Sequence, residues 1–252
     1  HEVIGLNPNN IIGYPSAKLM LADVLAKKLK EVNPDFIGLG GLCTDYAFIR
    51  DAINICRSVS PKTQIILGGQ MVNNDAEFIY QDLKPDYAVC GEGEIATLAI
   101  VEEELSKGII KGIEKDLNSL PFPDYEPFGI QAMLDYHSMD TRLLYRYTRP
   151  YARPFTIVAS RGCPFACTFC IDHHRSYRAR AIPNIMDEIY QTYEKYHYNI
   201  LIILDELFAV NRDRMAEFCN TVIQGKQEYG WDFDWTFQTH ASAKFNLTSL
   251  KL

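Results

Sequence analysis

Short apolar segments alternate with longer amphipathic segments along most of the chain, and this alternation limits the fold more than any other feature of the sequence. In the first part of the chain the expected strands are residues 3–6, 36–39, 64–67 and 87–90. The expected helices between and after them are residues 16–32, 46–59, 75–82 and 94–106. Strands that are apolar along their whole length are typical of parallel sheets covered by helices on both faces. Residues 1–106 are therefore predicted to form an open parallel α/β sheet.

The middle of the chain does not follow this alternation. Residues 107–154 contain five prolines and no long periodic segment, so we interpret them as a connector with one short helix at residues 130–136. The alternation then resumes, with strands expected at residues 155–159, 200–204 and 233–237 and helices at residues 183–196 and 211–229. Residues 155–252 are predicted to be the first part of a (β/α) barrel, because three strand–helix units cannot close one.

Composition excludes several classes of protein. The 252 residues are 47% hydrophobic and 23% charged, which is typical of a folded globular chain. A net charge of -7 argues against a nucleic-acid partner, and no apolar segment approaches the roughly 20 residues of a membrane helix. The N-terminus lacks the pattern of a signal peptide, and the seven cysteines are an odd number. We therefore expect free or metal-bound thiols in the reducing cytoplasm, with no membrane partner.

The strongest chemical motif is the segment RGCPFACTFC at residues 161–170, which directly follows an expected strand. Its cysteines, Cys163, Cys167 and Cys170, can reach one centre from a single loop, and three thiolates would leave one iron of a cubic cluster open to another ligand. A zinc site that adds His173 or His174 is an alternative, as are buried structural cysteines. The nearest later cysteine, Cys219, lies in an expected helix.

This segment resembles the Cys-x3-Cys-x-aromatic-Cys signature of the radical S-adenosylmethionine superfamily, with Phe169 at the aromatic position. The resemblance implies a 4Fe-4S cluster, binding of S-adenosylmethionine beside Phe169, and reductive cleavage of that molecule to a 5′-deoxyadenosyl radical. It also implies a reductant such as flavodoxin or ferredoxin.

Glycine pairs end the strands of the first domain. They lie in GLGGLCT at residues 38–44, GGQ at 68–70 and GEGE at 91–94. Ligands of open α/β sheets bind at these strand ends. Together with the cysteine segment they resemble the cobalamin-binding domain of cobalamin-dependent radical enzymes, in which residues 1–3 would belong to the second strand. The resemblance implies that the chain is truncated at both ends and that cobalamin contacts Thr44, Gly68, Gly69 and Glu92. A bulky side chain at Gly69 is expected to obstruct the corrin ring. The Asp-x-His-x-x-Gly motif of base-off cobalamin proteins is not present.

Polar residues follow two strands of the expected barrel. Asp205 and Glu206 come after residues 200–204, and the resemblance places one such carboxylate beside the ammonium or ribose of S-adenosylmethionine. Glu206 is the first choice for the ammonium, and capping of the next helix is the alternative. Gln238 and His240 follow the third strand and are candidates for the same mouth, with an exposed loop histidine as the alternative for His240.

Two further patterns, in the arginines and in the other cysteines, carry weaker information. Eight of the twelve arginines lie between Arg142 and Arg180, which indicates either a solvated face or a basic rim around an anionic cofactor and substrate. Cys43, Cys56 and Cys90 are scattered, and we interpret Cys43 as lining a loop and the other two as core rather than as ligands of a second cluster.

We expect an enzyme that transfers a methyl group to an unactivated carbon or phosphorus centre of a small-molecule or peptide substrate, with cobalamin as the methyl carrier. A radical cyclisation or rearrangement with the same cofactors is one alternative. A non-catalytic iron–sulfur or zinc-binding module is the other. No side chain is assigned a catalytic role.

Overall fold

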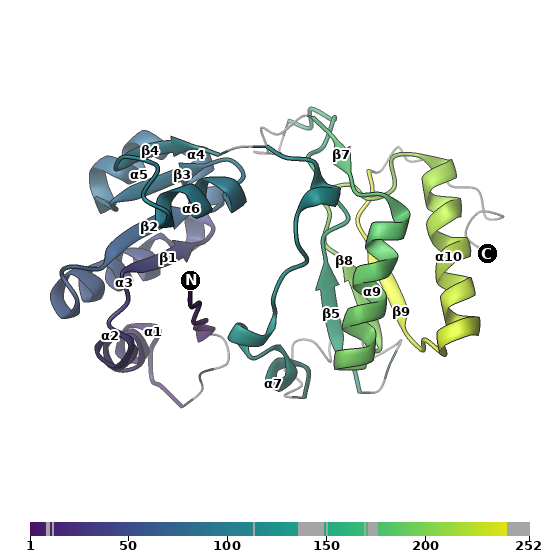
Figure 1. Cartoon of the computed structure of the whole chain (residues 1–252), viewed down its shortest axis with the longest axis horizontal. Coiled ribbons are helices and arrows are strands. Elements are labelled where there is room, and N and C mark those ends of the chain that lie inside the picture. Colours follow the sequence, from purple (N-terminus) through teal and green to yellow (C-terminus); the bar gives the residue numbers. More distant parts are fainter. Residues whose placement is uncertain are drawn as a thin grey trace. The chain divides into compact units, whose positions relative to one another are not determined.

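The structure, a computed structural model, describes residues 1–8, 11, 13–112, 114–135, 149, 151–168, 170 and 176–240. The chain divides into two compact units (Figure 1). The sheet unit is Ile11–Lys115, and the barrel unit joins His1–Asn10 to Asp116–Leu252.

The sheet unit is built on four parallel strands in the order β1-β2-β3-β4. They are β1 (Phe36–Gly40), β2 (Gln64–Gly68), β3 (Tyr87–Cys90) and β4 (Gly108–Lys111). Leu39 lies opposite Leu67, and Val89 lies opposite Ile110. Because the strands are parallel, their carboxyl ends share one edge of the sheet.

Helices connect these strands as the apolar periodicity predicts. They are α1 (Ala17–Met20), η2 (Leu21–Leu25), α2 (Ala26–Val32), η3 (Cys43–Asp45), α3 (Tyr46–Val59), α4 (Gln70–Asn74), α5 (Ala76–Leu83) and α6 (Glu94–Val101). Ile66 and Val89 pack in one core cluster with Ala96 and Ile100 of α6. Leu67, which points to the opposite face of β2, is also fully buried, so both faces of the sheet are covered.

Three expectations for this part of the chain are wrong. Residues 3–6 form no strand; Val3 is 72% exposed, and this segment belongs to the barrel unit, where Asn7 Nδ2 lies 3.1 Å from Met133 Sδ. The last helix ends at Val101 rather than at residue 106, and Glu103 has a positive φ of 60°. Strand β4 lies inside the segment expected to be a connector. This strand of four residues is too short to produce a periodic pattern, so it could not be predicted from the sequence.

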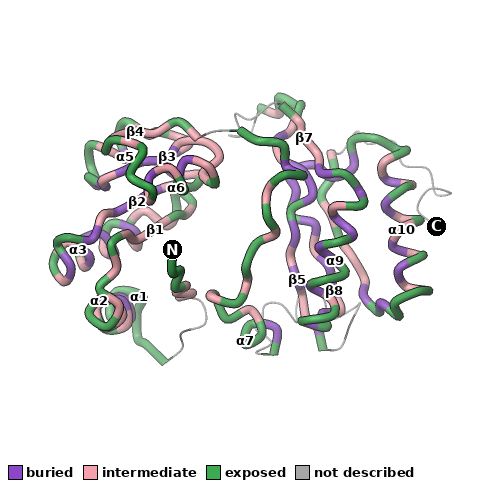
Figure 2. Tube along the Cα trace, viewed as in Figure 1, coloured by how far each residue is buried: buried purple, intermediate pink, exposed green. Residues whose placement is uncertain are grey.

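The barrel unit contains three parallel strands in the order β5-β8-β9. They are β5 (Pro154–Ile157), β8 (Ile200–Ile203) and β9 (Asp234–Phe237), and the long helices α9 (Ile182–Tyr196) and α10 (Arg212–Tyr229) connect them. Alternate strand residues such as Phe155 and Leu201 join Ile185 and Phe218 of the helices in one core (Figure 2). At the carboxyl ends Val158 is 41% and Leu204 56% exposed. The arrangement is that of consecutive (β/α) units of a barrel.

Smaller elements complete the barrel unit. They are η4 (Leu117–Ser119), η5 (Glu126–Phe128), α7 (Ile130–Asp135), β6 (Ser160–Arg161) and β7 (Arg178–Ala179). β6 and β7 pair antiparallel as a short ribbon. The expected helix at 130–136 forms up to Asp135, and residue 136 lies outside the described residues.

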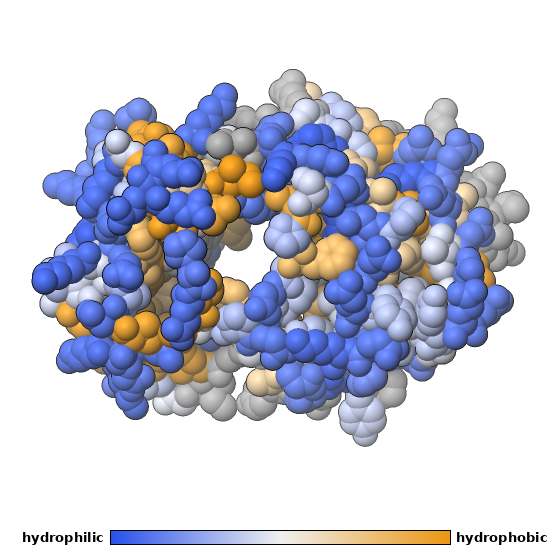
Figure 3. Space-filling view, viewed as in Figure 1, coloured by the Kyte–Doolittle hydropathy of each residue, from blue (hydrophilic) through white to orange (hydrophobic). Residues whose placement is uncertain are grey.

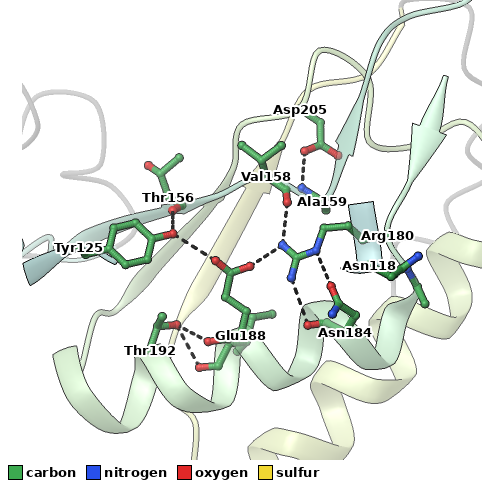
Figure 4. A network of polar contacts seen from close by, with 12 residues as sticks. Asn118, Tyr125, Thr156, Val158, Ala159, Arg180, Asn184, Glu188, Thr192 and Asp205 are labelled. Atoms are coloured by element: carbon green, nitrogen blue, oxygen red, sulfur yellow. Dashed lines mark hydrogen bonds and ion pairs between the residues drawn. The ribbon is translucent and has the colours of Figure 1, made fainter. Parts of the chain in front are cut away.

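Residues 116–128, expected to be a connector, belong to the barrel unit and are held to the rest of it by polar contacts (Figure 4). Arg180 forms an ion pair with Glu188, which is 1% exposed, and Tyr125 Oη donates to Glu188 Oε1 at 3.1 Å. Ala181 N donates to Asn118 Oδ1 at 2.6 Å. Burial, followed by the Glu188 charge, raises the pKa of Tyr125 far above its usual value, so Tyr125 is a donor here.

Ion pairs of this kind involve several of the arginines that were expected to form a solvated face or a basic rim. Besides Arg180, Arg149 pairs with Asp232 and Asp234, and Arg153 pairs with Asp135. At least three of the eight clustered arginines are therefore held by carboxylates of the barrel unit, and Arg142, Arg146 and Arg175 lie outside the described residues.

Hydrophilic side chains cover most of the face seen in Figure 3, with smaller apolar areas between them. Among the residues that the structure describes, none of the helices combines the length and apolar character needed to span a bilayer.

Candidate functional site

The cysteine segment is carried by the β6–β7 ribbon. Ser160 pairs with Ala179 and Arg161 with Arg178, so the two ends of the segment that carries the cysteines are tied together. Cys163 and Cys167 are half-buried, Cys170 is exposed, and all three are free thiols. Cys170 N donates to Cys167 O at 3.0 Å, which turns the backbone between these two cysteines. Phe169, His173 and His174 lie outside the described residues.

Asp205 fastens this ribbon to the end of β8. Its side chain is 1% exposed, and it accepts hydrogen bonds from Ala159 N at 2.7 Å and Ser160 Oγ at 2.5 Å. Burial raises the pKa of Asp205, and the hydrogen bonds from Ser160 and Ala159 and the charge of Arg214 oppose that shift. The structure thus gives Asp205 a role in positioning the cysteine loop.

Glu206, the next residue, is exposed. The two side chains of the acidic pair therefore have different surroundings, as expected for neighbours at a strand end. Helix capping, the alternative for this pair, is provided instead by Asn211, whose side chain accepts from Asp213 N at 2.8 Å at the start of α10. Glu206 remains the carboxylate of the pair that a bound ligand can reach.

The end of β9 reaches the same loop. His240 is half-buried, and its ring stacks on Phe165 with centroids 3.8 Å apart and planes 8° from parallel. Its Nε2 lies 3.6 Å from Cys167 Sγ. Gln238 is exposed, and its backbone oxygen accepts from Phe208 N at 3.1 Å. The carboxyl ends of β5, β8 and β9 thus meet at the cysteine loop.

The three cysteine thiols of this loop are chemically suited to bind an iron–sulfur cluster. Three free thiols, each at least partly exposed, lie within eight residues and can be deprotonated by a metal. Within the described part of the chain, no three His, Cys, Asp or Glu side chains are already converged on one metal position. Assembly of a cluster would therefore draw the three sulfurs together.

The carboxyl edge of the sheet unit forms a second candidate site. Gly69 follows β2 with φ 86° and ψ -175°, and a Cβ atom there would lie 2.9 Å from Gly41 N and 3.0 Å from Gly41 O. The structure therefore gives a reason of its own for glycine at this position, because the space next to it is filled by the neighbouring strand end. At Gly68 an added Cβ would meet only Val89 O, at 3.7 Å.

Other residues predicted for cobalamin lie along this edge. Thr44 is exposed in η3 after β1, and Glu92 is half-buried in the turn after β3. A Cβ atom at Gly112, after β4, would collide with the backbone of Glu92, so these two loops are in close contact. Cys43 is exposed here and receives a hydrogen bond from Asn74 Nδ2 at 3.0 Å.

Of the two remaining cysteines of the sheet unit, Cys56 lies in the core as expected, whereas Cys90 is only partly buried. Cys56 is buried in α3, and burial raises the pKa of its thiol to about 11, which keeps it protonated. Cys90 ends β3 and is half-buried. Nothing in the described residues gathers them with Cys43 into a metal centre.

Three contributors to the barrel site were missed from sequence. Ser160 lies in a two-residue strand that is too short to give a periodic signal. Phe165 is an ordinary apolar residue as far as the sequence shows. Its stacking partner, His240, lies 75 positions later, just after β9. Arg214 Nη2 lies 3.5 Å from Ala159 O, and the sequence carries no sign of this contact.

Comparisons with known proteins agree with both halves of this description. Residues 2–101 match the B12 binding domain family. An uncharacterized methyltransferase of Pyrococcus horikoshii is 24% identical over 267 residues, covering 96% of this chain and 53% of the relative. The anaerobic magnesium-protoporphyrin IX monomethyl ester cyclase of Cereibacter sphaeroides is 26% identical over 218 residues, covering 79% of this chain and 34% of the relative. The chain thus spans about half the length of these curated relatives or less.

Among solved structures, the radical S-adenosylmethionine methyltransferase TsrM of Kitasatospora setae has a similar fold. Its TM-score is 0.55 at 16% sequence identity, and the match covers 82% of this chain and 43% of that one. At this identity the likeness concerns the fold, a parallel α/β sheet unit followed by (β/α) units of a barrel.

Proposed function

We propose that this chain belongs to the cobalamin-binding radical S-adenosylmethionine family and takes part in radical methyl transfer with a 4Fe-4S cluster, S-adenosylmethionine and cobalamin. The observation that carries the proposal is the meeting of three strand ends at one loop. β5 leads to the three free cysteines, β8 to Asp205 and Glu206, and β9 to His240.

In this proposal Cys163, Cys167 and Cys170 bind three irons, and Glu206 accepts a hydrogen bond from the ammonium of S-adenosylmethionine. When bound, the cofactors supply an electron, a 5′-deoxyadenosyl radical and a carrier for the methyl group. Asp205 holds the ribbon in place, because its two hydrogen bonds fix the backbone immediately before the loop. Gln238 would line the same mouth, and Phe169 is assigned to it by its place in the cysteine signature alone.

The sheet unit would hold cobalamin at its carboxyl edge, where Thr44, Gly68 and Glu92 are found. The match to the B12 binding domain supports this assignment. Gly69 serves it indirectly, by allowing the ends of β1 and β2 to approach each other.

The substrate is proposed to be a small molecule or a peptide, and a flavodoxin or ferredoxin would supply the electrons. The seven cysteines are all free thiols, which supports a reducing, cytoplasmic location. Radical cyclisation remains the second candidate, supported by the similarity to the cyclase.

The first test measures how much iron and sulfide the protein binds. Anaerobic reconstitution of the full chain should give about four irons and four sulfides per chain. Cys163→Ala, Cys167→Ala and Cys170→Ala should each lose the cluster signal, and Cys219→Ala, a half-buried cysteine of α10, serves as the matched control. Retention of a complete cluster in any of the first three variants, or zinc in place of iron in the native protein, would contradict the proposal.

The second test separates the two reactions. S-adenosylmethionine labelled on its methyl group is added to the reconstituted protein with cobalamin and a reductant. Appearance of the label on cobalamin, together with 5′-deoxyadenosine, supports methyl transfer. Formation of 5′-deoxyadenosine with no label on cobalamin favours the cyclisation or rearrangement class.

A further inference from the structure

The contact between His240 and the cysteine loop is not needed to bind iron, since three thiolates already supply the ligands. His240 Nε2 lies 3.6 Å from Cys167 Sγ, which is within the range of a hydrogen bond to sulfur. The imidazole also stacks face to face on Phe165, at 3.8 Å between centroids. These two partners of His240 belong to the loop that would carry the cluster.

The backbone holds His240 in this position. β9 pairs with β8 up to Phe237, opposite Ile203, and Gln238 O accepts from Phe208 N at 3.1 Å. His240 follows two residues later. The ring is thus presented by an anchored strand end, and the stacking on Phe165 sets the plane in which its nitrogens lie.

We infer that His240 donates a hydrogen bond from Nε2 to the Cys167 sulfur and thereby raises the reduction potential of the cluster. The inference rests on the proposed function, because it requires an iron–sulfur cluster at Cys167. A neutral imidazole carries one N–H, and the tautomer protonated at Nε2 places that proton toward the sulfur. Hydrogen bonds to ligand sulfurs stabilise the reduced cluster, which carries more negative charge.

A different role, as a ligand of a single metal ion, is less well supported. A pair such as Cys167 and His240 needs further ligands to hold a single metal ion, whereas the three thiols of the loop already match the ligand set of a cluster. His240 is therefore assigned as a positioning residue that acts through Cys167.

Two substitutions of His240 distinguish the role of its N–H donor from the role of its aromatic ring. His240→Phe keeps an aromatic ring to stack on Phe165 and removes the N–H. His240→Gln keeps an amide N–H and removes the ring. His197→Asn is the matched control, because His197 ends α9 before the amino end of β8 and has a left-handed φ of 46° that asparagine tolerates.

The experiment measures iron content and the midpoint potential of the cluster in anaerobically reconstituted full chain, by titration followed with electron paramagnetic resonance. In His240→Phe the equilibrium constant for one-electron reduction should fall by up to about tenfold, equivalent to a shift of about 59 mV to more negative potential. His240→Gln should retain most of the native potential, and His197→Asn should retain all of it. In native protein labelled with 15N-histidine, the reduced cluster should show a weak nitrogen coupling that His240→Phe lacks.

The outcomes are distinct. If His240→Phe loses iron while His240→Gln keeps it at the native potential, the donor role is also supported. If both variants keep iron and the native potential, or if His240→Gln behaves as His240→Phe does, the inference is overturned although the proposed function stands. Strong, directly coordinated nitrogen coupling would overturn it in favour of ligation by His240. If the native protein itself assembles no cluster, the proposed function fails first.

Discussion

Ser160 Oγ donates a hydrogen bond to Asp205 Oδ2 at 2.5 Å, and this contact joins the ribbon that carries the cysteine loop to the end of the neighbouring strand β8. Ala159 N donates to the other carboxylate oxygen at 2.7 Å. The acidic residue thus connects two strand ends that are 45 positions apart in the sequence. Its loss should disturb the loop without touching any thiol.

Asp205→Ala should lower the free energy of unfolding by about 1–3 kcal/mol, because it leaves the buried Ala159 N without its acceptor and leaves Ser160 Oγ only the longer contact to Leu207 O at 3.3 Å. The measurement is urea unfolding of the metal-free protein, followed by circular dichroism. Glu206→Ala is the control: its side chain is exposed, so its effect should stay within about 0.5 kcal/mol. Equal effects at both positions would contradict the positioning role of Asp205.

Glu206→Gln should weaken binding of S-adenosylmethionine about ten- to a hundredfold while the iron count stays unchanged, because a hydrogen bond to a charged partner is lost. The cluster's electronic spectrum, recorded during titration with S-adenosylmethionine, reports the affinity. Asp205→Asn, which keeps a polar side chain of the same size, provides the comparison. An unchanged affinity in Glu206→Gln would remove Glu206 from the binding site.

Gly69→Ala should destabilise the sheet unit by about 1–3 kcal/mol, because Gly69 has a backbone conformation that is essentially restricted to glycine. The added Cβ atom would also press on Gly41 N at 2.9 Å. Gly68→Ala, whose Cβ would have only an ordinary contact with Val89 O, should cost much less. Thermal unfolding without cobalamin checks the comparison, and a stable Gly69→Ala variant that fails only to bind cobalamin would restore the steric explanation based on the corrin ring.

Asp86 should make the sheet unit sensitive to acid. Burial alone would raise its pKa, but hydrogen bonds from Lys107, Ile65 N and Arg57 outweigh burial and hold the pKa below the usual 3.8. A carboxyl group with a lowered folded-state pKa contributes stability that is complete above its unfolded pKa and is lost as the pH falls through its folded pKa.

Asp86→Asn should therefore cost about 1–3 kcal/mol near neutral pH, and the difference from the native protein should shrink below pH 3.8. Urea unfolding at a series of pH values gives this difference directly. Glu31→Gln, on an exposed ion pair with Lys27, should show almost none. A difference that stays constant down to the lowest pH would contradict the assignment.

Most strands and helices could be predicted from the sequence because their signals are local. The helix Tyr46–Val59 and the strand Tyr87–Cys90 have the bounds that periodicity predicts, since apolar spacing and the next turn residue are read within one segment. The cysteine spacing and the resemblance it carries are equally local. The segment at residues 3–6 shows the limit: it has the composition of a strand, but a strand also needs a neighbour with which to pair.

The relationships within the candidate site depend on tertiary structure. That Asp205 is buried while Glu206 is exposed, that Gly69 faces Gly41, and that His240 lies against Cys167 follow from which strands are adjacent and in what register. Each of these contacts joins residues at least 28 positions apart, apart from the acidic pair, whose two members differ only through their surroundings. Residue type and spacing thus determined which chemistry is available to this chain. Only the packing of parallel strand ends decided which side chains meet to perform it, because that packing brings distant residues to one edge.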